Sequence, residues 1–539
     1  MEFPKINRAC NSSGLTVGCA VLASPNTAAR YINVGKPWCM TLFRHVRPSG
    51  LVFIVVVALS VRLEAATFYI APNGNDTNAG TFGAPFFTVS KAASVAAAGD
   101  FIFLRGGTFN YTNTIRLTNS GGAGAPIRLW VYTNELPFLD FSSMADDGNN
   151  RGFLVTSNAN WWHFKGLEIY RAGDNGMKVE GSYNVIEQCS FHHNRDSGLQ
   201  IGLGDSDEDI STRVCSNLVL NCDSYLNYDP RASGGNADGF CCKLHPGAGN
   251  KFIGCRSWEN SDDGWDLYKN EFDVTLEDCW CWHNGDPASF GVGSAGNAEG
   301  FKLGGDSNFS GPRYLRRCIA FNNRYGSSSD GKAYHQNDHR GNITLYNCLS
   351  FSNNYNYALN NDVEANEYVA NCVGFNGVTK NFSFNSTTIQ TSNSWNFGTN
   401  IVNANASDYS GLTESLAKAP RQADGSLPAG FAHLVVSTDL IDRGADVGLP
   451  FTGARPDLGP FEFSVAPAAI TLSAAQFTNG GFRFQINGLT SHGPVVIHGS
   501  SNFTSWTPLF TNPAVTGSFP YFDAAASNAA VRLYRAEER

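Results

Sequence analysis

The chain carries little charge and no block of basic residues. Only 16% of its 539 residues are Asp, Glu, Lys or Arg, and the formal net charge is −9. Proteins that hold nucleic acids by neutralising phosphates need clustered Lys and Arg, so the sequence argues against a nucleic-acid partner. Because 42% of the residues are hydrophobic and 56 are Gly, the composition excludes disorder and favours a turn-rich β architecture.

One apolar run stands out, and it is too short to span a bilayer. It extends from Leu51 to Val61, follows a stretch with Arg44 and Arg47, and precedes RLEAA, which is the order of a signal peptide. The basic stretch, the apolar run and the RLEAA segment have the order of a signal peptide only if translation starts at Met40. We therefore predict that residues 1–39 are an over-extended gene model and that 40–65 are a signal peptide of a secreted protein, with no membrane segment in its mature form. The alternative is a true amino-terminal arm with a buried apolar segment.

A repeat runs through the middle of the chain. Seven cysteines each follow a short apolar-alternating run: Cys189, Cys222, Cys255, Cys279, Cys318, Cys348 and Cys372. Five positions after the first six comes an Asn: Asn194, Asn227, Asn260, Asn284, Asn323 and Asn353. Three positions after most of them is an aromatic residue: Tyr225, Trp258, Trp282, Phe321, Phe351 and Phe375.

The spacing of this repeat predicts an all-β chain folded as a parallel β-helix. Successive cysteines are 24 to 39 residues apart, as expected when each turn contains three short strands and loops of varying length. Equivalent residues would then stack about 4.8 Å apart. The Asn column would form an amide ladder at a turn, and the aromatic and Cys columns would be stacked core. Buried thiols behave as small hydrophobes, so we expect most cysteines to be free. One or two disulfides among Cys215, Cys241, Cys242 and Cys281 are the alternative, and zinc is the weakest option.

Segments of different character flank the repeat. TFYIAPNGND reads as a strand and turn, Val89–Ala98 as a short helix that caps the open end of the solenoid, and FIFLRGGTF and PIRLWVY as early strands. After Ala466 short alternating strands indicate a small β-sandwich-like module. The predicted domains are thus a β-helix over 66–465 and a module of unknown role over 466–539. A single chain of this fold buries enough surface to be a monomer.

A second column carries the candidate chemistry. The repeated segments SGLQ, DGFC, DGWD and EGFK each contain a polar residue, a Gly that permits a tight turn, an apolar residue and a variable one. Strand alternation predicts that Phe240, Trp265 and Phe301 point inward. Asp266 and Lys302 then share one exposed column on adjacent turns.

Acidic residues converge beside this column. Asp238 would stack on Asp263, with Asp262 and Asp266 next to the latter. Stacked carboxylates raise each other's pKa unless a cation lies between them. Calcium binds six to eight oxygens and suits such a site, whereas oxygen ligands alone argue against zinc or copper. The alternative is a set of solvated Asp residues in Asp-Gly turns.

Taken together, the signal peptide, the TFYIAPNGND entry, the Asn column and the motifs NADGF, SDDGWD and EGFKLGG resemble the pectate lyases of polysaccharide lyase family nine. The resemblance covers about residues 67–465 and implies a right-handed parallel β-helix. It also implies that Asp238, Asp262, Asp263 and Asp266 bind Ca²⁺, that Lys302 is the Brønsted base, and that the substrate is an acidic polysaccharide such as polygalacturonate or pectin.

The expected reaction is β-elimination. Lys302 would take the C5 proton of a 4-linked galacturonate, and the cation would stabilise the charge that develops on the substrate carboxylate. Lys178, Lys243, Lys269 and Arg316 are ordinary surface cations by default, and the alternative is that they face the same groove and bind uronate carboxylates. His245, His283 and His335 are expected in turns or loops. Two other functions stay open: a glycoside hydrolase with paired carboxylates, although the tripeptides GHG and RIK of polygalacturonases are missing, and a non-catalytic polysaccharide-binding β-helix.

Overall fold

The computed structural model describes residues 65–538, apart from 205–213, 294, 326–328, 362–365, 398–401, 464–469, 479, 491–492, 503 and 529–530. The predicted gene-model extension (1–39) and nearly all of the predicted signal peptide (40–65) lie outside these residues. Within the described part, no helix is both long and apolar enough to cross a membrane.

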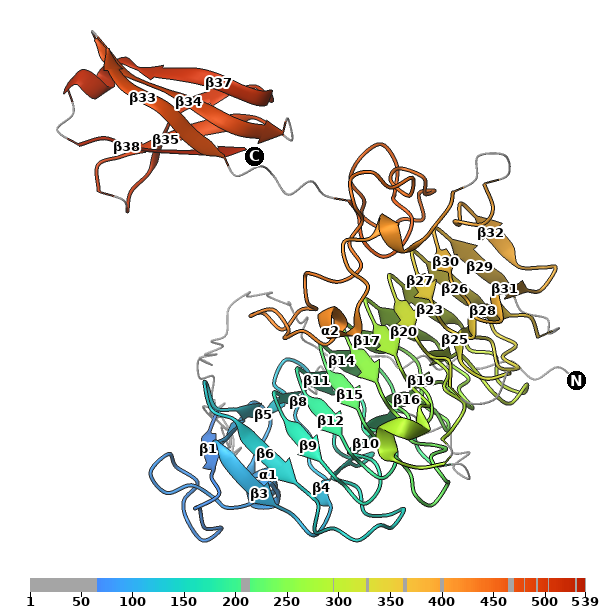
Figure 1. Cartoon of the computed structure of the whole chain (residues 1–539). Helices are drawn as coiled ribbons and strands as arrows, with labels where there is room; N and C mark the ends of the chain where they lie inside the picture. The colour runs from blue at the N-terminus through green and yellow to red at the C-terminus, as the bar shows by residue number, and fades with distance from the viewer. Residues whose placement is uncertain are drawn as a thin grey trace, which may run out of the picture. The chain divides into compact units, whose positions relative to one another are not determined.

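Short strands repeat in threes along most of the chain, and each of the three joins a different parallel sheet (Figure 1). The first sheet contains β1 (Thr67–Ile70), β2 (Phe101–Leu104), β5 (Ile127–Val131), β8 (Trp162–Lys165), β11 (Val185–Glu187), β14 (Leu218–Leu220), β17 (Asn250–Ile253), β20 (Val274–Glu277), β23 (Arg313–Arg316), β26 (Ile343–Tyr346), β29 (Glu367–Ala370) and β32 (Ile389–Thr391). The second contains β3 (Gly107–Asn110), β6 (Pro137–Asp140), β9 (Glu168–Tyr170), β12 (Ser190–His192), β15 (Asp223–Tyr225), β18 (Arg256–Trp258), β21 (Trp280–Trp282), β24 (Ile319–Phe321), β27 (Leu349–Phe351) and β30 (Val373–Phe375).

The third sheet contains β4 (Ile115–Leu117), β7 (Phe153–Val155), β10 (Met177–Val179), β13 (Leu199–Ile201), β16 (Phe240–Cys242), β19 (Trp265–Asp266), β22 (Phe301–Lys302), β25 (Lys332–His335), β28 (Tyr355–Leu359) and β31 (Lys380–Phe384). From β2 to β31 each coil contributes one strand to each sheet, and β1 and β32 extend the first sheet at its two ends. This arrangement is a parallel β-helix, and it confirms the predicted fold class.

The cysteine column lies inside the coils. All seven of its members belong to the core that the three sheets enclose, and none is more than 1% exposed. The described cysteines are buried and form no disulfide, in line with the prediction that most are thiols. Their thiols lie near backbone carbonyl oxygens of the same and the preceding coil, for example Cys255 Sγ at 3.5 Å from the oxygens of Val219 and Ile253. The thiols therefore act as compact packing groups.

The aromatic column is buried, but on the outside of the coils, so its placement in the solenoid core was wrong. Strand alternation explains the difference, because a residue three positions after an inward Cys points away from the interior. Its rings stack from coil to coil, with centroids 5.1 Å apart for Trp258 and Trp282 and 5.4 Å apart for Trp282 and Phe321. They form a second core with residues of the segment 402–463, which we call the strap. The strap includes η3 (Ala406–Asp408) and α2 (Glu414–Ala417).

The asparagine column forms the predicted amide ladder. Each amide nitrogen donates to the side-chain oxygen of the next Asn, at 2.9 Å from Asn194 to Asn227 and 2.8 Å from Asn227 to Asn260. A second ladder at another turn, through Asn184, Asn217 and Asn250, escaped the sequence analysis. Both ladders are buried and also satisfy backbone N–H groups of neighbouring coils.

We expect Asn260→Ala to destabilise the β-helix by roughly 2–4 kcal/mol, because each buried polar group left without a partner costs about 1–3 kcal/mol. Asn260 accepts from Asn227 and donates to Asn284 and to Ser257 Oγ. Denaturant unfolding measures the loss. The matched control is Asn113→Ala, an exposed amide whose side chain bonds only Thr112 Oγ1 among described atoms. Equal stability of the two variants would contradict a structural role for the ladder.

The two ends of the described chain also follow the sequence prediction. α1 (Val89–Val95) lies within the predicted helix and ends three residues before Ala98. The hydroxyl of Thr88, which caps it, accepts from the backbone N–H of Lys91, and Val89, Ala92 and Ala93 pack into the core. The carboxy-terminal module contains two antiparallel sheets, one of β33 (Thr471–Thr478), β34 (Gly481–Thr490) and β37 (Thr516–Asp523), and one of β35 (Val495–Ser500), β36 (Thr507–Asn512) and β38 (Leu533–Glu538). η4 (Ala524–Asn528) follows β37. A core of its own, with Phe484 and Ile486, holds this module together.

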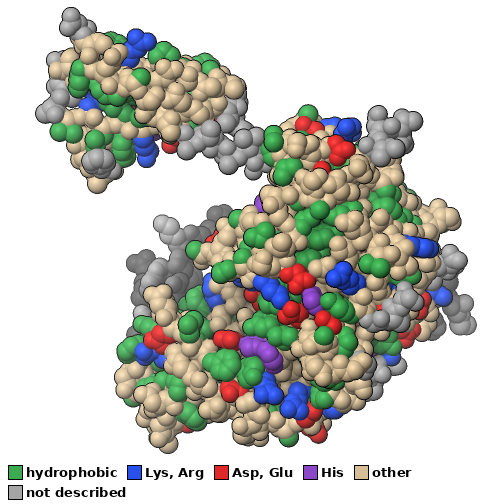
Figure 2. Space-filling view, in the orientation of Figure 1, with side chains coloured by type: hydrophobic (Ala, Val, Ile, Leu, Met, Phe, Trp, Pro, Cys, Tyr) green, Lys and Arg blue, Asp and Glu red, His purple; other side chains and the backbone are tan. Residues whose placement is uncertain are grey.

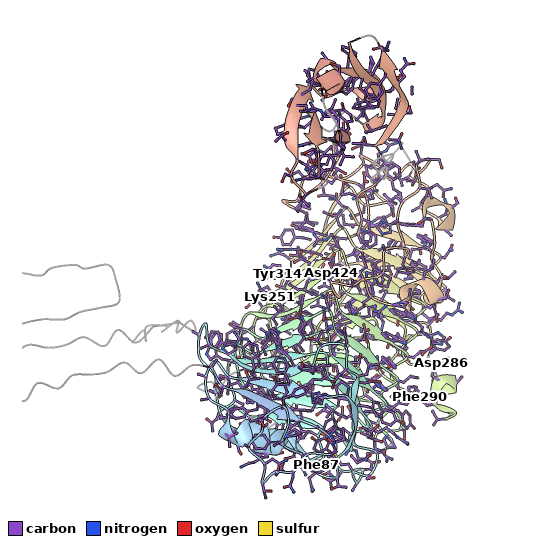
Figure 3. The ribbon with its side chains drawn as sticks, turned by 90° about the vertical axis from the view of Figure 1, so that its left-hand side faces the viewer. Phe87, Lys251, Asp286, Phe290, Tyr314 and Asp424 are labelled. Atoms are coloured by element: carbon purple, nitrogen blue, oxygen red, sulfur yellow. The ribbon has the colours of Figure 1, made fainter. Side chains whose placement is uncertain are left out.

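The described surface is sparsely charged. Figure 2 shows acidic, basic and His side chains gathered in patches among wide areas without charge, as expected for a chain with 16% charged residues. Figure 3 shows Lys251 and Tyr314, from β17 and β23 of the first sheet, on the opposite side from Asp286 and Phe290, which belong to the loop around η2 (Pro287–Phe290). The coils therefore present different faces, and only one of them carries the predicted site residues.

Candidate active site

Three neighbouring strands of the third sheet position the predicted site. β16, β19 and β22 pair in parallel, which places Cys241 beside Asp266 and Asp266 beside Lys302. Phe240, Trp265 and Phe301 are fully buried and stack at 5.1 and 5.0 Å between centroids. The predicted alternation is confirmed, because Asp266 and Lys302 line a groove on the other face of these strands. The expectation that this column is exposed was wrong for Asp266, which is buried.

A Gly precedes each of these aromatic residues. The sequence suggested that Gly permits a tight turn there, but the structure shows another reason for it. A Cβ on Gly264 would lie 2.5 Å from the carbonyl oxygen of Gly300, and one on Gly239 would lie 1.9 Å from Ser257 Oγ. Neither position has a positive φ angle. Gly is required here because adjacent coils approach closely, and this approach brings the acidic residues of successive coils together.

Three buried carboxylates meet at the groove. Single oxygens of Asp238, Asp263 and Asp266 all lie within 4.8 Å of one another. In each residue Oδ1 accepts a backbone N–H: Asp238 from Asp263, Asp263 from Glu299, and Asp266 from Tyr268. These bonds fix the carboxylates, so that three hard oxygen ligands face one space. This donor set fits a calcium ion.

Two lysines share the second oxygens of these carboxylates. Lys302 Nζ is 3.1 Å from Asp263 Oδ2 and 3.8 Å from Asp266 Oδ2. Lys243 Nζ is 2.7 Å from Asp238 Oδ2 and 3.1 Å from Asp266 Oδ2. The expectation of an ordinary surface cation was wrong for Lys243, which is buried. Strand alternation places it two residues after Cys241 on the same face, and that signal could have identified it.

The electrostatics of the cluster follow from burial and from these contacts. Burial raises the pKa of Asp238 to about 6, with Asp266 and Asp262 adding to the rise while Lys243 opposes it. Burial and Asp262 also raise the pKa of Asp263. Burial alone would raise the pKa of Asp266, but Lys302 and Lys243 hold it below its usual value. Burial would lower the pKa of Lys302, yet the surrounding carboxylates, Asp263 first, raise it well above the usual value. Nearby negative charges favour the charged ammonium form, so they raise the pKa of a lysine.

Asp262 lies at the edge of the cluster and holds two loops together. Its Oδ2 accepts from the backbone N–H of Asn236 at 2.8 Å, and its Oδ1 accepts from that of Asn297 at 2.7 Å. The loops before β16 and β22 are thereby tied to the coil of the acidic cluster. Each oxygen keeps a second lone pair for a metal, so a ligand role for Asp262 stays a prediction.

The groove beside the cluster has a volume of about 480 Å³. It is lined by Asp196, Gln200, Asn236, Lys243, Leu244, Asp266, Tyr268 and Lys302.

The next strand, β25, places His335 beside Lys302, and the imidazole ring of His335 pairs with Glu299 through Nδ1. The expectation that His335 lies in a turn or loop was therefore wrong. Arg316 belongs to the first sheet and not to this groove.

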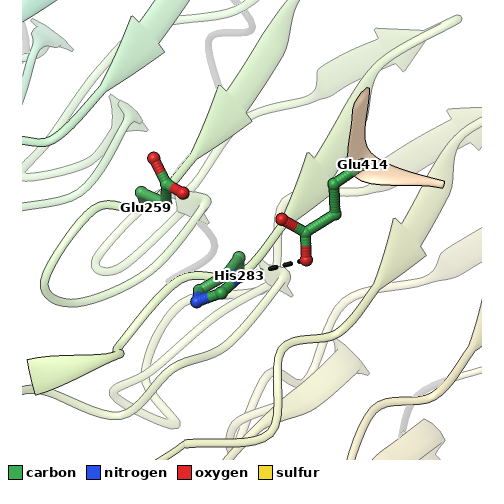
Figure 4. A group of neighbouring side chains, drawn as sticks. All are labelled: Glu259, His283 and Glu414. Atoms are coloured by element: carbon green, nitrogen blue, oxygen red, sulfur yellow. Dashed lines mark hydrogen bonds and ion pairs between the residues drawn. The ribbon is translucent and has the colours of Figure 1, made fainter. Parts of the chain in front are cut away.

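A second group of possible metal ligands in the described chain is occupied by ion pairs. Glu259, His283 and Glu414 lie together where α2 of the strap meets the coils (Figure 4). His283 Nδ1 is 3.0 Å from Glu414, its Nε2 is 2.9 Å from Asp286, and Glu259 pairs with Lys418 at 2.6 Å. Burial opposes the charged imidazole, but Glu414 and Asp286 raise the pKa of His283. These contacts attach the strap to the coils and use both ring nitrogens.

Comparisons with known proteins agree with this geometry. A model of the Pel9A-like right-handed beta helix region matches residues 68–381. Pectate lyase L of Dickeya dadantii (strain 3937) is 38% identical over 412 residues, which cover 73% of this chain and 90% of the relative. Pectate lyase L of Paenibacillus polymyxa (strain SC2) is 38% identical over 406 residues, 72% of this chain and 86% of the relative.

Solved structures give the same result. The crystal structure of pectate lyase Pel9A aligns over 74% of this chain and 96% of its own, with a TM-score of 0.65 and 36% identity. A rhamnogalacturonan lyase at 24% identity and a TM-score of 0.57 shares the fold. The chain therefore belongs to the Pel9A-like family of right-handed parallel β-helix proteins.

Proposed function

We propose that this protein is a calcium-dependent pectate lyase that cleaves 4-linked galacturonan by β-elimination, with Lys302 as the Brønsted base. The observation that carries the proposal is the position of Lys302 Nζ, which lies 3.1 Å from Asp263 Oδ2 and lines the same groove as Asp266, one of three converging buried carboxylates. The pectate lyases among its relatives support the reaction and the polygalacturonate substrate.

The residues of the chain have distinct parts in this mechanism. Asp238, Asp263 and Asp266 would hold the calcium ion, with Asp262 as a fourth ligand, and bound calcium would supply a Lewis acid for the substrate carboxylate. Lys302 accepts the C5 proton, and the electron pair of the broken C–H bond forms the C4–C5 double bond as the bond to the glycosidic oxygen breaks. That oxygen leaves with the electron pair of the broken bond and takes up a proton. No water is added across the broken bond, which separates this reaction from hydrolysis.

We also propose the organisation and setting that the sequence predicted. Residues 66–465 would be the catalytic β-helix domain, and 466–539 a module whose role is carbohydrate binding or surface attachment. The signal peptide over 40–65 would direct secretion, and the mature protein would be a monomer. The named relatives and the acidic-polysaccharide substrate support an extracellular setting.

Incubation with polygalacturonate should release products that absorb ultraviolet light, because elimination leaves a double bond conjugated to the carboxylate. The rate should increase with pH, since Lys302 accepts a proton only when neutral and the neighbouring carboxylates raise its pKa. Absorbance of the products at several pH values measures both effects. New reducing ends without absorbance would instead indicate a glycoside hydrolase, and absence of any product would indicate a binding protein.

A further inference from the structure

Lys243 occupies the space where the acidic cluster faces the groove. Its ammonium bridges Asp238 Oδ2 and Asp266 Oδ2, which belong to successive coils. The Oδ1 atoms of both residues are already bonded to backbone N–H groups. Each Oδ1 keeps only one further lone pair, so a metal ion that binds Asp238 and Asp266 without sharing these bonded oxygens would use the two Oδ2 atoms that Lys243 now contacts.

The charges of the site also indicate that Lys243 and a metal ion would serve the same carboxylates. Asp238, Asp262, Asp263 and Asp266 carry four negative charges when ionised, and Lys243 and Lys302 carry two positive ones. Without a metal, Lys243 is the group that keeps Asp238 and Asp266 from repelling each other, because Lys302 lies next to Asp263 and Asp266 instead.

We propose that Lys243 is a displaceable counter-ion that competes with Ca²⁺ for Asp238 and Asp266. The inference rests on the calcium site of the proposed function and deepens it. The ammonium stabilises the metal-free site, and it leaves these two oxygens when calcium binds. Lys243 lines the groove, so that its flexible side chain has open space beside it. Lys243 is thus a positioning residue that sets how tightly calcium is held.

The test compares variants that remove or keep the charge. Lys243→Met and the more polar Lys243→Gln remove it, and Lys243→Arg keeps it. Lys251→Met is the matched control, because Lys251 is an exposed lysine of β17 in the first sheet and is not among the residues that line the groove. Calorimetric titration of chelator-stripped protein with calcium chloride gives the affinity, and thermal unfolding with and without EDTA gives the Tm.

We expect both uncharged variants to bind calcium on the order of tenfold more tightly or more, because a positive charge within a few ångströms of the ion is removed. We also expect them to have a lower Tm than the unchanged protein in EDTA and a similar Tm in saturating calcium. Lys243→Arg should keep the lower affinity, and Lys251→Met should behave like the unchanged protein.

Unchanged or weaker calcium binding in the uncharged variants would overturn the proposal, since Lys243 would then be neutral to binding or would help to orient the ligands. If the unchanged protein binds no calcium at all, the proposed calcium site fails. The Tm values in EDTA still decide in that case whether Lys243 stabilises the carboxylates.

Discussion

Replacing Lys302 with alanine should abolish lyase turnover, with a loss of at least about 10²–10⁴-fold, the usual contribution of a positioned general base. Lys302 lies beside Asp266 in register and lines the groove, where its amine can reach a substrate proton. Initial rates of absorbance increase on polygalacturonate, at saturating calcium and alkaline pH, measure the loss.

Binding of polygalacturonate should survive in the same variant, because most groove contacts remain. Affinity electrophoresis in gels with polygalacturonate measures it. Lys251→Ala is the control for loss of a lysine elsewhere and should keep full activity. Substantial lyase activity in Lys302→Ala would falsify its role as the base, whereas loss of both binding and folding would show a structural role.

Removal of calcium should have an effect of comparable size. We expect EDTA to lower activity by at least about 10²-fold and to lower the Tm, because the buried carboxylates would then repel one another. Calcium should restore both. Magnesium should restore little, since it demands a tighter octahedral shell and keeps its waters.

Asp263→Asn should reproduce the loss of activity in the presence of calcium, because it removes a charged ligand from the centre of the cluster. Asp424→Asn is its control, an exposed acidic residue of the strap whose side chain accepts from the backbone N–H of Ser426. Calcium titration of both variants separates loss of metal from loss of fold. Full activity of the EDTA-treated protein would argue against any metal in the reaction.

The parts of the fold that repeat could be predicted, because the same residue pattern recurs in successive coils and each occurrence indicates the same packing. The Cys column and the Asn ladder predicted the coils, and the polar-Gly-aromatic segments brought Asp266 and Lys302 to neighbouring strands. Even there, the outward direction of the aromatic column required counting strand alternation from the Cys. The repeat alone did not reveal the strap that covers it.

Features that occur once could not be predicted. Asp262 binds backbone groups of two loops of unlike length, and no spacing in the sequence indicates such contacts. The pairing of His335 with Glu299 depends on how neighbouring strands are registered. The strap joins residues far apart in sequence, as in the bond from Arg256 to the carbonyl oxygen of Ala417.

The strap also has a consequence for biosynthesis. A chain that emerges from its amino terminus can stack its coils one after another, since each contacts mainly its neighbours. The outer row from Trp258 to Phe375, however, is covered by residues that are made later. Until about residue 463 is available, the nascent protein presents a strip of bare aromatic rings, which is the surface that chaperones recognise and that aggregates form on.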